Sequence, residues 1–479
     1  MESHQEHLVR GFNWLGGATI LSKVIDFSTI LIVLLFLTKD QVGLASLVVS
    51  FGMVIEAVNG FGTNEALVQA STVSRHQLDT LFWFIFGAAL LVAGLTLLAA
   101  PWIAMLYGSS AMTIYFVAIA IKQPVVGAAV IPLAILNRNL QYERIAIINV
   151  CSTLAAALTR LSLAVAGAGT WALVLGYAAS GLYTLIGATI ANPFRPSLRF
   201  QLSSILPLVH YGLRAATSNI FEQLFKNVDY LLVGWFYGAA PLAVYRVAFD
   251  IAMEPAMAVG TLVNRTALPV FAKLSSVKKQ LALSLTWALG RLSTLVFPLM
   301  MGLMLVATPL SVLLHDKQGH SYAAAALPLK LLAAAALLRV TTQLLYPLLM
   351  GSGRPGVAAR LSATTLLLLT TGILITGLSF PATTGIVVVA AVWLAVYPLL
   401  LLWGGRYLWR HWDIRVTELV RPLIAPSIAI AILVASVNIA GLLGISTDPR
   451  IQIGLVVTAT AMTYCGLFLF GHHRRAQAA

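Results

Sequence analysis

Long apolar runs, separated by short polar connections, follow one another along the whole chain. Marking these runs between turn signals predicts about fourteen helical spans, each as long as the ~20 residues that cross a bilayer's hydrocarbon core. The expected limits are 11–37, 42–68, 79–101, 111–135, 143–165, 169–191, 209–236, 242–270, 280–308, 322–350, 356–378, 382–405, 418–441 and 451–471. We therefore expect an all-α polytopic membrane protein.

Basic residues concentrate in alternate connections, and this predicts how the chain is oriented. Most of the 30 Lys and Arg residues lie in one set of connecting segments, whereas the other set holds only Lys39, Lys317 and Arg450. Because cytoplasmic loops carry an excess of basic residues, both termini are expected in the cytoplasm. The net charge of +14 is then mainly a signal of topology, and no nucleic-acid partner is predicted.

The seventh and eighth spans carry charges at depths where charge is costly. On the seventh span, polar positions recur every three or four residues and so share one helix face: Arg214, Ser218, Glu222, Lys226 and Asp229. The eighth span repeats the arrangement with Arg246, Asp250, Glu254, Thr261 and Arg265. An ionisable group inside a bilayer costs roughly 2.5–3.5 kcal/mol on insertion scales, so it normally faces water or a charged partner. The pattern predicts a hydrated internal cavity.

Several of these charges can neutralise one another on their own helix. Glu222 and Lys226 are spaced i,i+4, and so are Arg246 and Asp250. Asp229 and Glu254 have no such neighbour. Either carboxylate can bind a coupling proton or sodium ion, or it can pair with a cation on another span, for which the candidates are Lys122, Arg291 and Arg339.

The first hairpin resembles the seventh and eighth spans at an offset of 200 residues. The matching positions are Leu31, Val33, Phe36, Met53, Gly60 and Asn64 with Leu231, Val233, Phe236, Met253, Gly260 and Asn264. Internal repeats are common in transporters, whose substrate site lies at the repeat interface. We expect an N-terminal lobe over residues 1–200, a second lobe over 201–410 and two accessory spans over 411–479.

Short motifs along the chain resemble one known family. They are GFNWL at 11–15, DQVGLA at 40–45, FGTNEALVQ at 61–69, LNRNLQY at 136–142, NVDYLLVGWFYGAAPLAVY at 227–245 and LVNRTALPVFAKL at 262–274. Together they resemble the polysaccharide-exporter branch of the multidrug/oligosaccharidyl-lipid/polysaccharide flippase superfamily. The resemblance covers at least residues 8–350, and the last four spans fit by count alone.

This resemblance implies a fold and a function. The fold is two six-helix lobes around a central cavity, with alternating access and two accessory helices. The substrate is an oligosaccharide linked to undecaprenyl pyrophosphate, flipped from the cytoplasmic to the periplasmic face for O-antigen, capsule or exopolysaccharide assembly. Family members carry cavity-facing basic residues on the first and eighth spans, where Lys23 and Arg265 lie. Related lipid flippases can also carry an arginine on the second span, whereas this chain has Glu56 and Glu65 there.

Candidate site residues follow from these two lines of argument. A pyrophosphate that loses its hydration needs fixed positive charge, for which the candidates are Lys23, Arg214, Lys226 and Arg265. The candidates for ion coupling are Asp26, Asp229, Asp250 and Glu254. Each candidate also has a structural alternative. Lys23 and Asp26 lie one turn apart and can form an ion pair, whereas Arg214 and Arg265 can extend to the membrane interface.

Other classes of protein fit the sequence less well. There is no Walker-type phosphate loop and no HExxH motif, and Cys151 and Cys465 lie in apolar spans without metal-ligand spacing. We therefore expect no enzyme activity, cofactor or metal site beyond proton or sodium coupling. One alternative is a cation-coupled multidrug antiporter, for which an acidic cavity would be expected. Another is a membrane polysaccharide polymerase or glycosyltransferase, although the longest outward connection, near 315–322, is short for a catalytic domain.

The expected setting is the bacterial inner membrane. There the protein would be monomeric and would work beside polymerase and export machinery.

Overall fold

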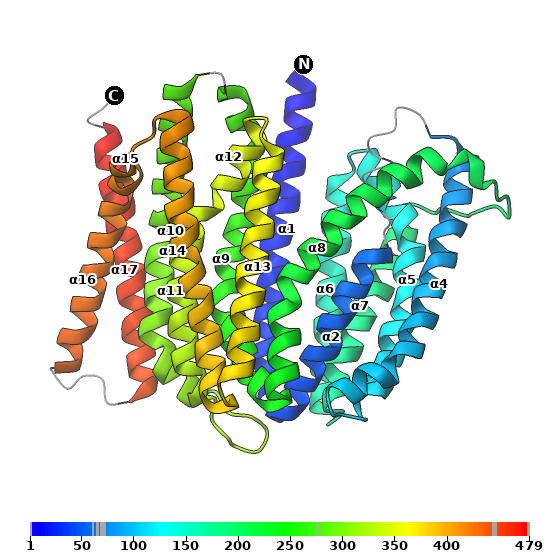
Figure 1. The fold of residues 1–479 in the computed structure, drawn as a ribbon, viewed down its shortest axis with the longest axis horizontal. Helices are drawn as coiled ribbons and strands as arrows, with labels where there is room; N and C mark the ends of the chain where they lie inside the picture. The colour runs from blue at the N-terminus through cyan, green and yellow to red at the C-terminus, as the bar shows by residue number, and fades with distance from the viewer. Residues whose placement is uncertain are drawn as a thin grey trace. The chain divides into compact units, whose positions relative to one another are not determined.

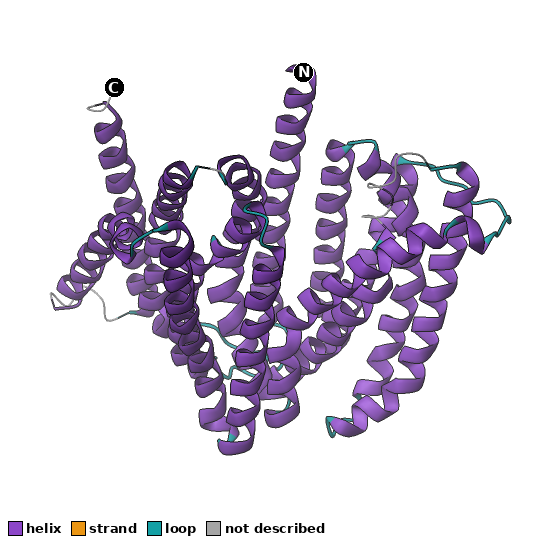
Figure 2. Ribbon diagram, turned by 45° about the horizontal axis from the view of Figure 1, so that its top comes forward, coloured by secondary structure: helices purple, strands orange, loops and turns teal. Residues whose placement is uncertain are grey.

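The structure is a computed structural model that describes residues 2–59, 62–63, 67, 73–275, 277–442 and 448–476. Within these ranges, the side chains of residues 2–13, 211, 214–215, 218, 261–262, 264–266, 269, 440–442 and 468–476 are outside the description. Figure 2 shows long helices joined by short loops, and the described residues contain no β-strand. The predicted all-α fold is confirmed.

The helices group into two compact units. The first unit comprises Met1–Ala243 and Asp316–Gln318. Its helices, shown in Figure 1, are α1 (Glu2–Leu34), α2 (Lys39–Asn59), α4 (Arg75–Leu106), α5 (Met112–Arg138), α6 (Tyr142–Val165), α7 (Thr170–Ala191), η1 (Leu202–Ser204), α8 (Leu206–Tyr237) and the start of α9 (Ala239–Leu274).

The second unit comprises Val244–His315 and Gly319–Ala479. It holds the rest of α9 together with α10 (Lys278–Leu313), η2 (Ala323–Ala325), α11 (Ala326–Gln343), α12 (Leu345–Gly351), α13 (Pro355–Ser379), α14 (Ala382–Trp412), α15 (Val416–Val420), η3 (Arg421–Leu423), α16 (Ile424–Leu442) and α17 (Pro449–Ala476). The unit boundary falls inside α9, and the predicted division into lobes at residue 200 stays a prediction.

Each predicted span has its counterpart among these helices, and eleven helices in the described chain are long and apolar enough to cross a membrane. Two spans expected to be single helices are interrupted. The span at 322–350 breaks between α11 and α12, and the span at 418–441 is split into α15, η3 and α16. Pro347 lies just after the first break and Pro422 lies within η3, and each proline lacks the backbone N–H that would bond four residues back.

Helix α4 shows why the spanning helices carry apolar residues on every face. Leu81, Ile85 and Ala89 lie one helical turn apart and are almost fully buried, where α4 packs on α5. The other faces are also apolar but exposed, as at Leu98 and Trp102, with 72% and 69% of their surface accessible. A hydrocarbon solvent requires no polar face. One stripe of α4 therefore packs on protein, and we assign the rest to lipid.

In the second unit, α9 and α14 meet through buried aromatic side chains. Trp393 donates its indole N–H to the Tyr245 hydroxyl at 2.9 Å, and neither residue exposes more than 1% of its surface. The ring of Phe249 lies 5.4 Å from that of Trp393, centroid to centroid. A buried tryptophan needs such a partner for its N–H, and this contact fixes α14 against α9.

Two contacts in the first unit hold its helix ends together. A side chain at Gly43 on α2 would overlap the backbone of Ala239, because an added Cβ would lie 1.8 Å from that carbonyl oxygen. Tyr107, just after α4, donates its hydroxyl to the carbonyl of Leu231 on α8 at 3.1 Å. Burial raises the pKa of Tyr107 to about 12, so the phenol remains a donor at physiological pH.

The close approach at Gly43 yields a first prediction. Gly43→Val should lower the thermal stability of the purified protein, since overpacking against an immovable backbone costs about 1–3 kcal/mol or more. Gly87→Val on α4 is the matched control, because nothing lies within 4 Å of a Cβ added there. Equal melting temperatures for the two variants in detergent would contradict this account of the contact.

Candidate functional site

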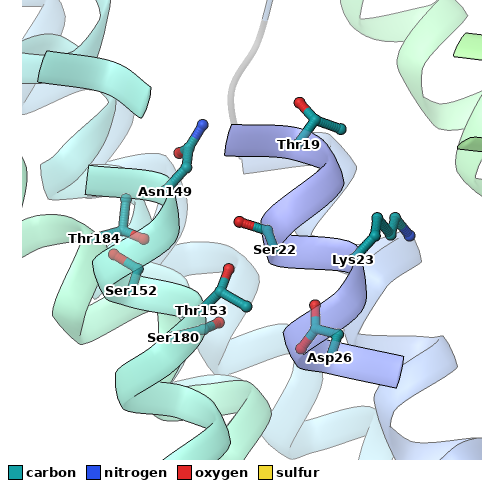
Figure 3. A pocket seen from close by; sticks show the side chains of 9 residues that line it. All are labelled: Thr19, Ser22, Lys23, Asp26, Asn149, Ser152, Thr153, Ser180 and Thr184. Carbon is teal, nitrogen blue, oxygen red and sulfur yellow. The ribbon is translucent and has the colours of Figure 1, made fainter. Parts of the chain in front are cut away.

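A polar cavity lies among α1, α6 and α7. Its volume is about 290 Å³, and all nine residues that line it have polar side chains: Thr19, Ser22, Lys23, Asp26, Asn149, Ser152, Thr153, Ser180 and Thr184. Figure 3 shows these side chains gathered from the three helices. The sequence identified two of them, Lys23 and Asp26. Because α1, α6 and α7 are all apolar enough to span a membrane, the cavity is a polar site within spanning helices.

Asp26 is held by a residue to which the sequence assigned no role. Nη2 of Arg160 on α6 lies 2.6 Å from Oδ1 of Asp26, an ion pair that joins α1 to α6. Asp26 thus has a partner on another helix, and its pairing with Lys23 stays a prediction. Asp26 keeps 38% of its side chain exposed, whereas Arg160 keeps 13%. The cavity therefore has a neutralised carboxylate at one end.

A second charged cluster joins α2, α5 and α7. Nζ of Lys122 lies 2.7 Å from Oε2 of Glu56, and the Tyr177 hydroxyl donates to the same oxygen at 2.5 Å. The Lys122 ammonium also lies over the Tyr177 ring, 3.2 Å from its centroid, which adds a cation–π attraction. Only 3% of the lysine side chain is exposed, against 32% of the glutamate side chain. The sequence offers Lys122 as a partner for Asp229 or Glu254, whereas the structure pairs it with Glu56.

Two glycines on α7 make room for these cations. A Cβ at Gly176 would lie 2.1 Å from Cγ of Arg160, and one at Gly181 would lie 3.2 Å from Cε of Lys122. The aliphatic stems of both cations therefore pass against bare α7 backbone. This arrangement lets long side chains reach partners on other helices while their stems stay packed.

The charged face of α8 and α9 is partly neutralised within each helix. Lys226 donates to Glu222 at 2.6 Å, and Nε of Arg246 lies 3.2 Å from Oδ2 of Asp250. Both predicted i,i+4 pairs are confirmed. The substrate role of Lys226 and the coupling role of Asp250 stay predictions.

Four further candidates complete the predicted set. Asp229 is fully buried, and its Oδ1 accepts the backbone N–H of Tyr230 at 2.9 Å. Glu254 lies on α9 and is partly buried. Arg214 and Arg265 lie on helices α8 and α9, but their side chains are outside the described residues. The structure therefore leaves the roles of all four as predictions.

The expected absence of a metal site stays a prediction for the chain, of which the structure describes the larger part. No group of three or more His, Cys, Asp or Glu side chains there could hold a metal ion. Cys151 and Cys465 are free and exposed.

The chain is similar to known polysaccharide biosynthesis proteins. A family model described as "Polysaccharide biosynthesis protein" matches residues 32–323. The lipopolysaccharide biosynthesis protein WzxC of Escherichia coli is 24% identical over 367 residues, covering 74% of this chain and 72% of the relative. The teichuronic acid biosynthesis protein TuaB of Bacillus subtilis is 24% identical over 365 residues, covering 75% and 74%.

Solved structures show the same fold at low sequence identity. The lipid II flippase MurJ in an inward closed conformation superposes with a TM-score of 0.72 at 14% identity, covering 94% of this chain and 97% of MurJ. An inward-facing multidrug resistance MATE transporter of the MOP superfamily gives a TM-score of 0.61 at 13% identity, covering 82% and 94%. The fold is therefore that of the MurJ and MATE transporters.

The Glu56–Lys122 pair generates a prediction about stability. Glu56→Gln should destabilise the protein more than Lys122→Met, because it leaves a buried ammonium without its counter-ion. Breaking a buried pair in this way costs about 3–5 kcal/mol. Lys122→Met leaves instead a carboxylate that is one-third exposed and still accepts from Tyr177.

The double variant, Glu56→Gln with Lys122→Met, should recover much of the loss, since it leaves neither charge behind. Melting temperatures of the three purified proteins in one detergent provide the measurement. A Glu56→Gln protein as stable as the parent would show that the pair contributes no stability.

Proposed function

The chain belongs to the family of polysaccharide biosynthesis proteins, and from this membership we propose that it is a flippase for lipid-linked oligosaccharide. It moves an oligosaccharide on undecaprenyl pyrophosphate from the cytoplasmic to the periplasmic face of the inner membrane. The glycan then serves O-antigen, capsule or exopolysaccharide assembly.

The observation that carries the proposal is the polar cavity within spanning helices. Sugar hydroxyls and a pyrophosphate lose their hydration in hydrocarbon, and each unpaired polar group there costs several kcal/mol. The nine lining residues offer hydroxyl, amide, ammonium and carboxylate groups in place of water. Such a lining suits a polar headgroup, while an undecaprenyl tail can stay in the bilayer.

Charge in the cavity favours an anionic substrate. The cavity is lined by one cation, Lys23, and one carboxylate, Asp26, and Arg160 places a second cation beside that carboxylate. A pyrophosphate needs such a cation. The multidrug antiporters share the fold, but a cationic drug would be better served by an unpaired carboxylate, and we favour the lipid-linked glycan for that reason.

The translocation step itself is proposed to be alternating access, without a chemical reaction on the substrate. Its driving force is proton or sodium coupling, with Asp26, Asp229, Asp250 and Glu254 as the candidate carboxylates. The protein is a multi-pass membrane protein. We propose that both its termini are cytoplasmic, that it is monomeric, and that it acts beside a polymerase and export machinery.

Deleting the gene in its own host should trap undecaprenyl-linked repeat units on the cytoplasmic face and abolish the surface polysaccharide. The trapped lipid is measured by extraction and by its accessibility to periplasmic glycosidases. Intact surface polysaccharide with no trapped intermediate would refute the proposal.

Complementing the deletion tests Lys23. Lys23→Ala should lower export about tenfold or more, the loss expected for one hydrogen bond to a charged group, while Lys23→Arg retains most of it. Lys279→Ala, an exposed lysine at the start of α10, is the matched control. Export at the parental level with Lys23→Ala, at equal protein abundance, would exclude Lys23 from the headgroup site.

A further inference from the structure

One wall of the α1–α6–α7 cavity is built from neutral hydrogen-bonding groups. Six hydroxyl side chains and one amide line it, and those on each helix lie within about one helical turn of one another: Thr19 and Ser22 on α1, Asn149, Ser152 and Thr153 on α6, and Ser180 and Thr184 on α7. This spacing brings the groups of each helix to a single face. No aromatic or aliphatic side chain is among the lining residues, and the apolar part of the surface comes from carbon atoms of these polar residues.

Two of these hydroxyls are buried without a partner. The Oγ atoms of Ser22 and Ser152 have no accessible surface to speak of and no hydrogen bond within the described chain. Ser152 as a whole is 6% exposed. By contrast, Thr19 and Ser180 donate to backbone carbonyls on their own helices, each at 2.7 Å. Buried hydroxyls are normally satisfied, and within the described chain the hydrogen-bonding capacity of these two is unmet.

The charges beside this wall show what kind of ligand fits. Asp26 is neutralised by Arg160 at 2.6 Å, and in Figure 3 the Lys23 ammonium points away from the α6 and α7 hydroxyls. The wall itself therefore carries no net charge to attract a phosphate or a cation. A ligand with several neutral hydroxyls, each able both to donate and to accept, matches it best.

Size narrows the choice further. A volume of about 290 Å³ lies at the lower limit of the ~300–1,000 Å³ that ligand pockets span. That space suits one sugar ring, and because the cavity is open, the rest of a larger ligand would lie outside it.

We propose that this cavity is a sugar subsite that binds one pyranose ring of the lipid-linked glycan, with Ser22 and Ser152 donating to or accepting from its hydroxyls. The proposal rests on the flippase function. It adds that the pyrophosphate and one sugar ring of the headgroup occupy different positions in the protein. The pyrophosphate stays outside the hydroxyl wall, on the side to which Lys23 points, and one neutral ring enters the wall.

The sugar subsite is tested by measuring the affinity of lipid probes for the full-length protein in lipid nanodiscs. The probes are undecaprenyl pyrophosphate and the same lipid carrying one glucose or one N-acetylglucosamine. The parent protein should bind the better sugar-bearing lipid about tenfold or more tightly than the bare lipid, the gain expected from two hydrogen bonds. In the double variant Ser22→Ala with Ser152→Ala this ratio should fall to about one, with affinity for the bare lipid unchanged.

Two controls separate a sugar contact from a structural role. The double variant should melt at the parental temperature or above it, because it removes hydroxyls that have no partner in the empty protein. Ser162→Ala, an exposed position on α6 outside the cavity, should keep the tenfold ratio. Lys23→Ala should weaken both kinds of lipid alike and leave the ratio intact.

The failures of the two proposals differ. If the parent binds both lipids but shows no preference for the sugar, or if the double variant keeps the preference, the sugar subsite is wrong and the flippase function stands. If the parent binds none of the lipids, the flippase function fails and the subsite fails with it.

Discussion

The structure depends on one constraint, namely that a charge inside the hydrocarbon must be paired. Two described carboxylates reach partners on other helices, Asp26 to Arg160 and Glu56 to Lys122. Two others are neutralised one turn away on their own helix, Glu222 by Lys226 and Asp250 by Arg246.

The two kinds of ion pair respond differently when helices move. A pair between helices must break if those helices separate, whereas a pair within one helix moves with it at no electrostatic cost. The interhelical pairs therefore tie α1 to α6 and α2 to α5, and the Tyr177 hydroxyl adds α7 to the second group. The pairs within α8 and α9 would stay intact if either helix moved.

Small residues make the interhelical pairs feasible. Long basic side chains lose much rotamer freedom when they are fixed, and without space they could not lie along a neighbouring helix. Gly176 and Gly181 on α7 provide that space for Arg160 and Lys122. Close packing against bare backbone also replaces part of the dispersion attraction that lipid would have supplied. The ion pairs thus depend on the two glycines, because a larger side chain at either glycine would push a cation away from its carboxylate.

How far the sequence predicts this structure depends on the range of each interaction. Spans are visible because hydrophobicity is a property of one segment, and the i,i+4 pairs are visible because helix geometry alone brings Glu222 to Lys226. The breaks near Pro347 and Pro422 are local too. Pro347 lies in a continuous apolar run, whereas Pro422 follows Arg421, and neither position by itself shows that the span breaks. The residues of the Asp26–Arg160 pair lie 134 positions apart in the sequence, and neither segment indicates which residue the other will contact.

The hydroxyl wall is hard to predict for a different reason. Serines and threonines in spanning helices commonly bond the carbonyl four residues back, as Ser46 and Thr96 do here, so their spacing does not distinguish a site from ordinary helix chemistry.

A neutral lining has an advantage for a transporter that a charged lining lacks. An ion pair strengthens as water is excluded, so a site built only from cations would hold a pyrophosphate tightly and release it slowly. Hydrogen bonds between hydroxyls are worth much less each and exchange readily with water when the site opens. Recognition through hydroxyls such as those of Ser22 and Ser152, with charge confined to Lys23 and the Asp26–Arg160 pair, would let the protein select a glycan without trapping it. The separation of neutral and charged groups on α1 and α6 is therefore suited to a cargo that must be bound on one face of the membrane and released on the other.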